Sequence, residues 1–371
     1  MPVNLTLMLV HNGPASDRLV FYISRKPVML FYRCFSFIVC LIMITFSSSV
    51  LTADEYLTET KKELILTAQE YLFNDNFMLA REVLDSLIRS NPDDPIGYLY
   101  KAAVYLGEMT DTEKNLFPDH FKRLIDTAAF LAEKNIDPAQ PTYSAWMYLC
   151  LGHSSAYKSL WESRFGSFTS ALKYGLKAKS AYADGLAFDS TVFDLYGGLG
   201  MYHYWKSVKA GFLRWIGIFK NDKQKGIDEL YLTMDSSIIS KDIAHNALIW
   251  IWLDKKEYDS VIVICNEMLN IYPYGKMFLW PLARAYFKKK IYHKSLEIYL
   301  LLKKKILISP GNYFNLVECD YNLHRCYKEM KRDEKAKQIA LELVDYYEKI
   351  PPKIRWRQRS KIAYLKRTLN R

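Results

Sequence analysis

The sequence has few of the residues that interrupt secondary structure, with 13 prolines and 15 glycines among 371 residues. Proteins built from many short strands and turns usually need more of both, so this scarcity favours long helices. No His-Glu-x-x-His segment, Cys-x-x-Cys pair, phosphate-binding loop or dinucleotide-binding glycine motif occurs. The sequence therefore gives no motif for metal-dependent hydrolysis or for nucleotide chemistry.

Acidic residues are absent from the last 19 positions, although the whole chain has a net charge of +11. The signal-like N-terminal region is also basic, and residues 54–352 are close to neutral. The chain is therefore not a generally basic protein of the kind that coats nucleic acids. The basic residues of the tail are Lys353, Arg355, Arg357, Arg359, Lys361, Lys366, Arg367 and Arg371.

Cysteine is scarce, and only four of the six cysteines lie outside the N-terminal region, at positions 150, 265, 319 and 326. Within one helix, Cys319 and Cys326 would be about 10.5 Å apart along the axis. A disulfide tolerates at most about 7 Å between Cα atoms, so this pair cannot close. We expect all four to be small buried apolar side chains.

One long uncharged run, Phe35–Phe46, follows Arg25, Lys26 and Arg33 and precedes small residues up to Ala53. A basic flank, a short apolar run and small residues are typical of a secretory signal. The run is short for a membrane span, which needs about 20 residues. If it extends to Leu51, an uncleaved membrane anchor is an alternative to a cleaved signal, and a buried helix is a further alternative. The late basic flank suggests translation from Met29. The segment Met29–Ala53 predicts export, to the periplasm or as a membrane-anchored protein.

Apolar side chains are abundant, at 50% of residues, and aromatic residues reach 15%. They recur with a period of 34 residues. The unit beginning at Lys61 is followed at Pro95 by a second, and the unit beginning at Asp242 is followed at Lys276 by another. The repeated positions are a small residue and an aromatic in a first helix, an aromatic opening a second helix, and a closing proline. Such periodicity indicates a repeat architecture.

These features resemble the tetratricopeptide (TPR) repeat, as found in exported bacterial-type proteins. The resemblance implies an all-α, TPR-like right-handed α-solenoid of antiparallel helix hairpins. About seven hairpins are expected over residues 54–350, after an N-terminal extension and signal or anchor at 1–53. The basic residues 351–371 are expected to form a capping helix, which such arrays need at an open end.

Candidate catalytic and metal-binding groups have simpler interpretations. The segment from Gly152 to Ala156 contains a serine but lies in a helical pattern and lacks the second glycine of a nucleophile elbow. His324 lacks the cysteine spacing of a zinc site. We expect His203 and His245 to be structural, and we predict no enzyme activity, no metal and no cofactor.

The resemblance places partner-binding residues on the concave face, which the first helix of each hairpin lines. Aromatic side chains with a few polar groups suit recognition, because they bury much area at low entropic cost. The alternative is that several of them only pack between repeats. The positions selected are Tyr196, His203, Tyr204, Asn246, Trp250, Trp280 and Arg284.

The stretch 191–219 combines five glycines with eight large aromatic residues. Its first part, Thr191–Lys209, is predicted to be a first helix, with glycines where close packing needs small residues. The loop that follows is long for a hairpin connection and rich in aromatic residues. Its candidate contact residues are Phe212, Arg214, Trp215 and Phe219.

The sequence thus predicts a non-enzymatic scaffold that binds a protein or peptide on its concave face, in a cell-envelope or secretion-related assembly. The alternatives are a membrane-anchored or cytoplasmic TPR adaptor, or an enzyme with a pocket at the central aromatic loop. The basic tail is either a solvated cap face or a peripheral contact with an anionic membrane. Nucleic acid is not an expected partner.

Overall fold

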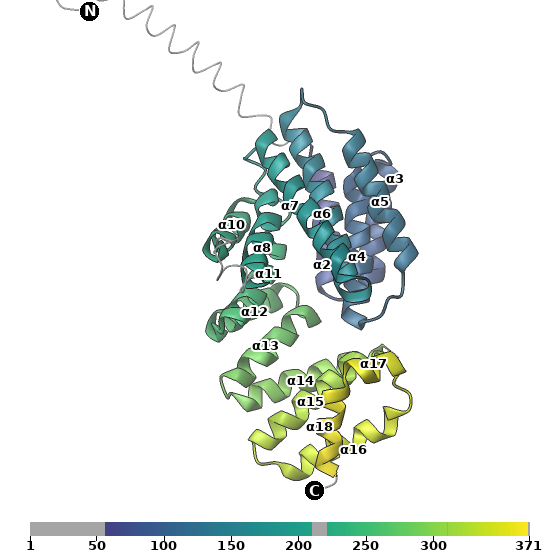
Figure 1. The fold of residues 1–371 in the computed structure, drawn as a ribbon, viewed down its shortest axis with the longest axis vertical. Coiled ribbons are helices and arrows are strands. Elements are labelled where there is room, and N and C mark those ends of the chain that lie inside the picture. Colours follow the sequence, from purple (N-terminus) through teal and green to yellow (C-terminus); the bar gives the residue numbers. More distant parts are fainter. Residues whose placement is uncertain (1–55, 210–220, 310, 370–371) are drawn as a thin grey trace, which may run out of the picture. The chain divides into compact units, whose positions relative to one another are not determined.

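The computed structural model describes residues 56–209, 221–309 and 311–369, which belong to one compact unit spanning residues 53–371. These residues form 16 helices and no strand (Figure 1). Each helix packs mainly on the helices before and after it in the chain. The prediction of an all-α helical array is therefore confirmed.

The first half of the array runs to the segment after α8, and the second begins at α10. The helices are α2 (Glu59–Phe73), α3 (Phe77–Ser90), α4 (Pro95–Thr112), α5 (Pro118–Lys134), α6 (Pro141–Phe165), α7 (Phe168–Phe188) and α8 (Asp194–Lys209). They continue with α10 (Lys223–Ser236), α11 (Lys241–Lys255), α12 (Tyr258–Ile271), α13 (Lys276–Lys288), α14 (Tyr292–Ile308), α15 (Tyr313–Glu329), α16 (Asp333–Tyr347), α17 (Pro352–Arg357) and α18 (Arg359–Leu369).

Several hairpins share one turn conformation between their two helices. Asp75, Lys256, Lys290 and Lys331 follow the first helix of a hairpin, and each has a positive φ between 57° and 66°. A left-handed residue is a common way to end a helix, because it allows the chain to reverse tightly. Lys256 and Lys290 are 34 positions apart, in agreement with the repeat period in the sequence.

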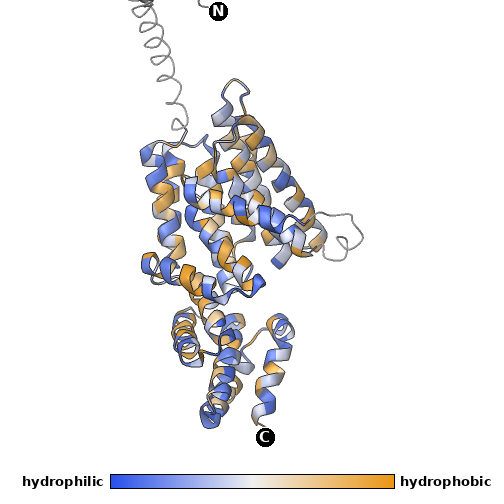
Figure 2. Cartoon of the chain, turned by 90° about the vertical axis from the view of Figure 1, so that its left-hand side faces the viewer, coloured by the Kyte–Doolittle hydropathy of each residue, from blue (hydrophilic) through white to orange (hydrophobic). Residues whose placement is uncertain are grey.

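Apolar stripes along the helices form the core (Figure 2). The early hairpins share one large buried cluster, in which Ile65, Leu99 and Trp146 are almost completely inaccessible to solvent. Smaller clusters follow along α8–α11, α11–α13, α13–α16 and α15–α18. This succession of local cores is typical of a repeat array.

Glycines bring helices of the central hairpin into close contact. A Cβ on Gly200 of α8 would lie 2.7 Å from the carbonyl oxygen of Gly226 in α10, and a Cβ on Gly226 would lie 2.6 Å from that of Gly200. The ring of Tyr182 likewise occupies the space beside Gly152 and Gly198. The glycines of this stretch therefore serve close helix packing, as the sequence predicts.

Two predicted features of the helices differ from the structure. The central helix begins at Asp194 rather than Thr191. The Asp194 carboxylate accepts hydrogen bonds from the backbone N–H groups of Ile238 and Ile239, both at 3.0 Å. The predicted capping helix is two helices, α17 and α18, which meet at Gln358.

The first hairpin also contacts a segment about 200 residues later, which a simple array of neighbouring repeats does not require. Phe73, at the end of α2, packs against Tyr272 and Phe278 with ring centroids 5.0 Å and 6.0 Å away. Asn74 accepts a hydrogen bond from the N–H of Tyr274 at 3.2 Å. We call this docking of residues 73–75 onto residues 272–278 the closure contact.

The close packing of α8 and α10 leads to a stability prediction. Gly200→Ala should lower the free energy of unfolding by about 1–3 kcal/mol, because the added methyl group meets backbone rather than a movable side chain. Gly175→Ala in α7 is the matched control, since its new Cβ has only the Ser159 hydroxyl nearby, at 3.5 Å. In a helix that change should be neutral or stabilising by up to about 1 kcal/mol. Equal effects in urea unfolding would contradict this account.

Candidate functional site

A cavity of about 630 Å³ lies between the first hairpins and helices α13 and α15. Its walls come from two distant parts of the chain, since Leu72, Phe77 and Thr110 face Met277, Trp280 and Tyr321 across it. Figure 1 shows α8–α13 along one side of the molecule, connecting α2–α7 to α14–α18. The closure contact joins these two parts of the chain beside the cavity.

Three of the seven predicted concave-face residues line this cavity. Trp250 of α11 is 40% exposed, and Arg284 of α13 is also exposed. Trp280 is half-buried and packs edge to face on Tyr299, with ring centroids 6.0 Å apart. Because Trp280 and Arg284 are four residues apart on one helix, they project from the same face of α13.

The other four predicted residues do not line the cavity. Tyr204 is fully buried and donates a hydrogen bond to Asp254 Oδ2 at 2.8 Å. His203 is also buried, with Nδ1 2.6 Å from Glu229 Oε2. Both side chains face α10 or α11, so the prediction that they are presented on the concave face is wrong for them.

Tyr196 and Asn246 are both half-buried. The ring of Tyr196 stacks on Phe193, with centroids 6.2 Å apart. The Oδ1 atom of Asn246 is buried and has no hydrogen-bond partner among the described residues. Neither residue reaches the cavity, and their predicted role in partner binding stays a prediction.

Charged groups next to the closure contact join the two walls. Lys276 Nζ lies 2.7 Å from Asp111 Oδ2 and 3.8 Å from Asp75 Oδ2. Asn315 of α15 donates from Nδ2 to the backbone carbonyl of Asp111. One amine therefore serves two carboxylates, and burial raises the pKa of the Asp75 carboxyl to about 6.

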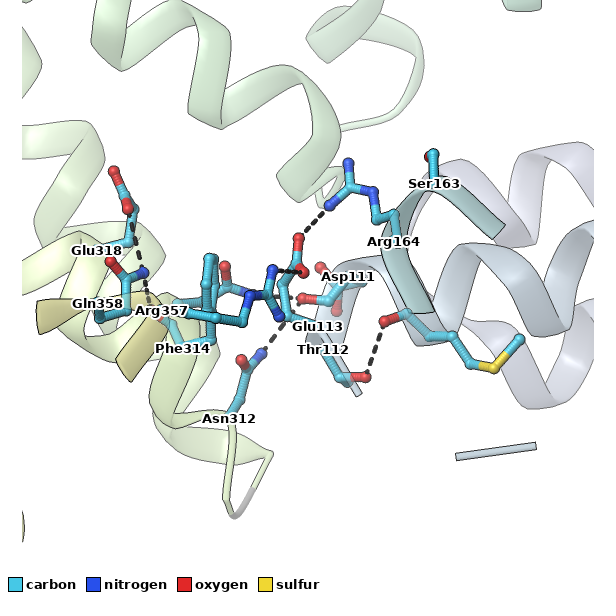
Figure 3. A network of polar contacts seen from close by, with 12 residues as sticks. Asp111, Thr112, Glu113, Ser163, Arg164, Asn312, Phe314, Glu318, Arg357 and Gln358 are labelled. Carbon is cyan, nitrogen blue, oxygen red and sulfur yellow. Dashed lines mark hydrogen bonds and ion pairs between the residues drawn. The ribbon is translucent and has the colours of Figure 1, made fainter. Parts of the chain in front are cut away.

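Glu113 forms a second connection between the walls (Figure 3). Its carboxylate accepts a hydrogen bond from Arg164 of α6 and another from Arg357 of α17, the latter at 2.7 Å. Glu113 is in the left-handed conformation with φ 53°, where it ends α4. The end of α4 is therefore held by cations from early and late helices.

His153, His245 and the four cysteines at positions 150, 265, 319 and 326 have partners inside the protein or lie in its core. His153 Nδ1 is 2.8 Å from the Tyr182 hydroxyl, and burial lowers the pKa of His153 to about 4. His245 Nδ1 is 3.1 Å from the carbonyl of Lys241. The four cysteines of the array are buried, as predicted. Ser154 lies within α6, which agrees with the helical interpretation of that segment.

His324 of α15 is buried, and neither of its ring nitrogens has a hydrogen-bond partner in the described part of the chain. Burial lowers its pKa, and its ring meets the ring of Tyr364 edge to face. In residues 56–209, 221–309 and 311–369, no group of three His, Cys, Asp or Glu residues is arranged to hold a metal ion.

Much of the basic tail contacts the protein itself. Besides the pair with Glu113, Lys361 Nζ lies 2.5 Å from Glu318 Oε2, and Lys366 Nζ lies 3.3 Å from the ring centroid of Tyr347. Lys353, Arg359 and Arg367 remain exposed. Some basic residues of the tail thus bind other parts of the protein, and others face solvent. The predicted contact of the tail with an anionic membrane stays a prediction.

Two predicted features lie outside the described residues. They are the central-loop residues Phe212, Arg214, Trp215 and Phe219, and the export segment Met29–Ala53. Among the helices that are described, none combines the length and the apolar character needed to cross a membrane.

Sequence reasoning missed the residues that form the second half of the site. Asp75 follows α2 and Asp111 lies in the last turn of α4, where in the sequence both resemble ordinary polar residues of helix ends. Arg325 lies on α15, a helix from which no partner-binding residue was predicted. Its guanidinium carbon is 4.2 Å from the ring centroid of Phe287. Helix α15 is the first helix of the hairpin α15–α16, so the repeat register that selected Trp280 and Arg284 on α13 also applies to it. The acidic partners carried no such signal.

A comparison with models of known protein families finds no match for this sequence. No curated protein matches it either.

The closure contact predicts a pH-dependent effect of Asp75. Its folded pKa of about 6 exceeds the ordinary value of 3.8, so this carboxyl favours the folded state when protonated and disfavours it as the pH rises through 6. Asp75→Asn keeps an oxygen to accept the N–H of Lys276 and removes the buried charge. At pH 8 the variant should be more stable by about 2–3 kcal/mol.

At pH 4 the same variant should match the wild type in thermal unfolding. The control is Asp345→Asn, which changes an exposed carboxylate and should have little effect at either pH. A destabilised Asp75→Asn protein at pH 8 would show that the charge stabilises the closure contact.

Proposed function

We propose that this protein is a non-enzymatic interaction scaffold, which binds a peptide or partner protein in the cavity enclosed by its helices. The observation that carries the proposal is the presence of Trp250, Trp280 and Arg284 together in the cavity wall. Trp and Arg are enriched among the residues that dominate binding energies, so their presence together on one wall favours recognition of a partner.

The size of the cavity supports this proposal. Pockets that bind small molecules typically enclose about 300–1,000 Å³, so a cavity of about 630 Å³ has room for a few side chains of a bound segment. Its lining mixes aromatic rings with amide and charged groups, such as Asn315, Asn322 and Arg325. Rings supply contact area, and the polar groups fix the orientation of a bound chain.

The finer description remains part of the proposal. The 34-residue spacing and the repeated left-handed turns favour a TPR-like right-handed solenoid, in which the cavity is the concave side. The basic flank and apolar run before Ala53 favour an exported protein that acts in an envelope assembly. A cytoplasmic or membrane-anchored adaptor is the alternative, and sequencing the N-terminus of the mature protein distinguishes them.

The test is partner capture from envelope extract by the full chain and its tryptophan variants. Replacing Trp250 and Trp280 together by alanine should abolish capture, because it removes both aromatic contacts of the wall. The melting temperature should change by only a few degrees, since neither ring is fully buried. Trp356→Ala is the matched control, because Trp356 is 66% exposed and lies outside the cavity lining.

Undiminished capture by the double variant would contradict the proposed site. A large drop in its melting temperature would assign the two rings to the core instead. Turnover of a small substrate by a chain that captures no macromolecule would favour the enzyme alternative.

A further inference from the structure

The charges around the cavity are unequally compensated. The lining contains four acidic residues, Asp75, Asp111, Glu113 and Glu318. Each has a cation within the protein: Lys276 serves the first two, Arg164 and Arg357 serve Glu113, and Lys361 serves Glu318. The acidic side of the cavity is therefore already neutralised by the fold.

Three cations of the lining have no such partner. Arg284, Lys288 and Arg325 form no ion pair with any acidic residue in the described part of the chain. Arg284 and Lys288 are one turn apart on α13, where like charges repel each other slightly. Three neighbouring uncompensated cations in a partly enclosed cavity create a positive potential that attracts anions.

Aromatic rings hold one of these cations in place. The guanidinium carbon of Arg325 lies 4.2 Å from the ring centroid of Phe287 and 5.3 Å from that of Tyr321. Stacking on two rings restricts the side chain and leaves the edge of the guanidinium for bidentate bonds to a carboxylate. Both tryptophans of the cavity lie in the same lining as the three cations.

We propose that the partner segment is acidic, with carboxylates that pair with Arg284, Lys288 and Arg325 and apolar side chains that contact Trp250 and Trp280. This inference rests on the proposed function, because it specifies the chemistry of the segment bound in the same cavity. Carboxylates of a peptide fit better than a compact anion, since cations and tryptophans are distributed over helices α11, α13 and α15.

The experiment selects a random library of 12-residue peptides, displayed on phage, against the full-length protein. The same library is selected in parallel against the Trp250→Ala/Trp280→Ala variant and against the Arg284→Gln/Arg325→Gln variant. We expect enrichment of acidic peptides that contain apolar residues on the wild type, and loss of enrichment on both variants. Lys304→Gln, which changes an exposed lysine of α14 outside the cavity, should enrich the same peptides as the wild type.

Selected peptides are then synthesised, and their affinity is measured by fluorescence anisotropy. Each of Arg284→Gln and Arg325→Gln should weaken binding about tenfold, as expected for loss of one charge-assisted contact. Replacing the glutamates of a peptide by glutamines should weaken binding by at least that factor. Arg284→Gln should keep the wild-type melting temperature, because Arg284 is exposed. Arg325→Gln should lower it by at most a few degrees, because it loses only the ring contacts with Phe287 and Tyr321 and leaves no acidic partner unpaired.

The outcomes separate the two proposals. Enrichment of neutral or basic peptides that depends on the tryptophans would overturn the acidic partner and keep the proposed function. Enrichment that is equal on the wild type and the tryptophan variant, or absent on both, would overturn both. Two further outcomes would assign the binding of acidic peptides to another basic surface. One is that the arginine variants bind an acidic peptide as tightly as the wild type does. The other is that a short single-stranded DNA displaces the peptide completely while the tryptophan variant binds the peptide with unchanged affinity.

Discussion

The closure contact between residues 73–75 and residues 272–278 is the interaction on which the rest of the structure depends. Helical repeats normally contact only their neighbours, so a long array bends through many small independent steps. Here Phe73 joins the buried cluster of α11–α13, and it is only 4% exposed. Burying such a ring contributes roughly 1.5–3 kcal/mol.

Electrostatics gives the closure contact its specificity. Lys276 lies between two carboxylates that come from the first two hairpins, and Glu113 lies between arginines of α6 and α17. Removing a partner from such a partly buried group leaves an uncompensated charge, which is costly. The same pairs neutralise the acidic wall of the cavity, so the cations of α13 and α15 dominate its potential. Closure and the chemistry of the site are therefore linked through the same side chains.

The local features of the fold could be predicted from the sequence. Repeat spacing indicated the hairpins, and the glycines of the stretch 191–209 indicated close helix packing. These are signals within one helix or one hairpin. Of the proposed site, the same register selected Trp250, Trp280 and Arg284, because cavity-lining positions recur on the first helix of each unit.

The long-range part of the fold could not be predicted in this way. Nothing in the segments around Asp75 and Asp111 indicates that Lys276 and Asn315 lie beside them, because the accumulated rotation of several repeats decides which distant residues meet. The register also failed at Tyr204, whose ring turns into the α8–α11 core and whose hydroxyl binds Asp254. A repeat pattern specifies helix faces, and it does not specify how far a large side chain reaches into a neighbouring helix.

The most direct test of closure is the distance between spin labels on Asp119 of α5 and Lys353 of α17, both exposed, measured by electron double resonance. The wild-type full chain should give one narrow distance distribution. Lys276→Met should give a broader distribution with longer distances, because Asp75 and Asp111 then lack their shared amine, a change that costs about 3–5 kcal/mol for a buried pair. Lys304→Met, on an exposed face of α14, should leave the distribution unchanged. An identical narrow distribution for Lys276→Met would contradict the central role of the closure contact.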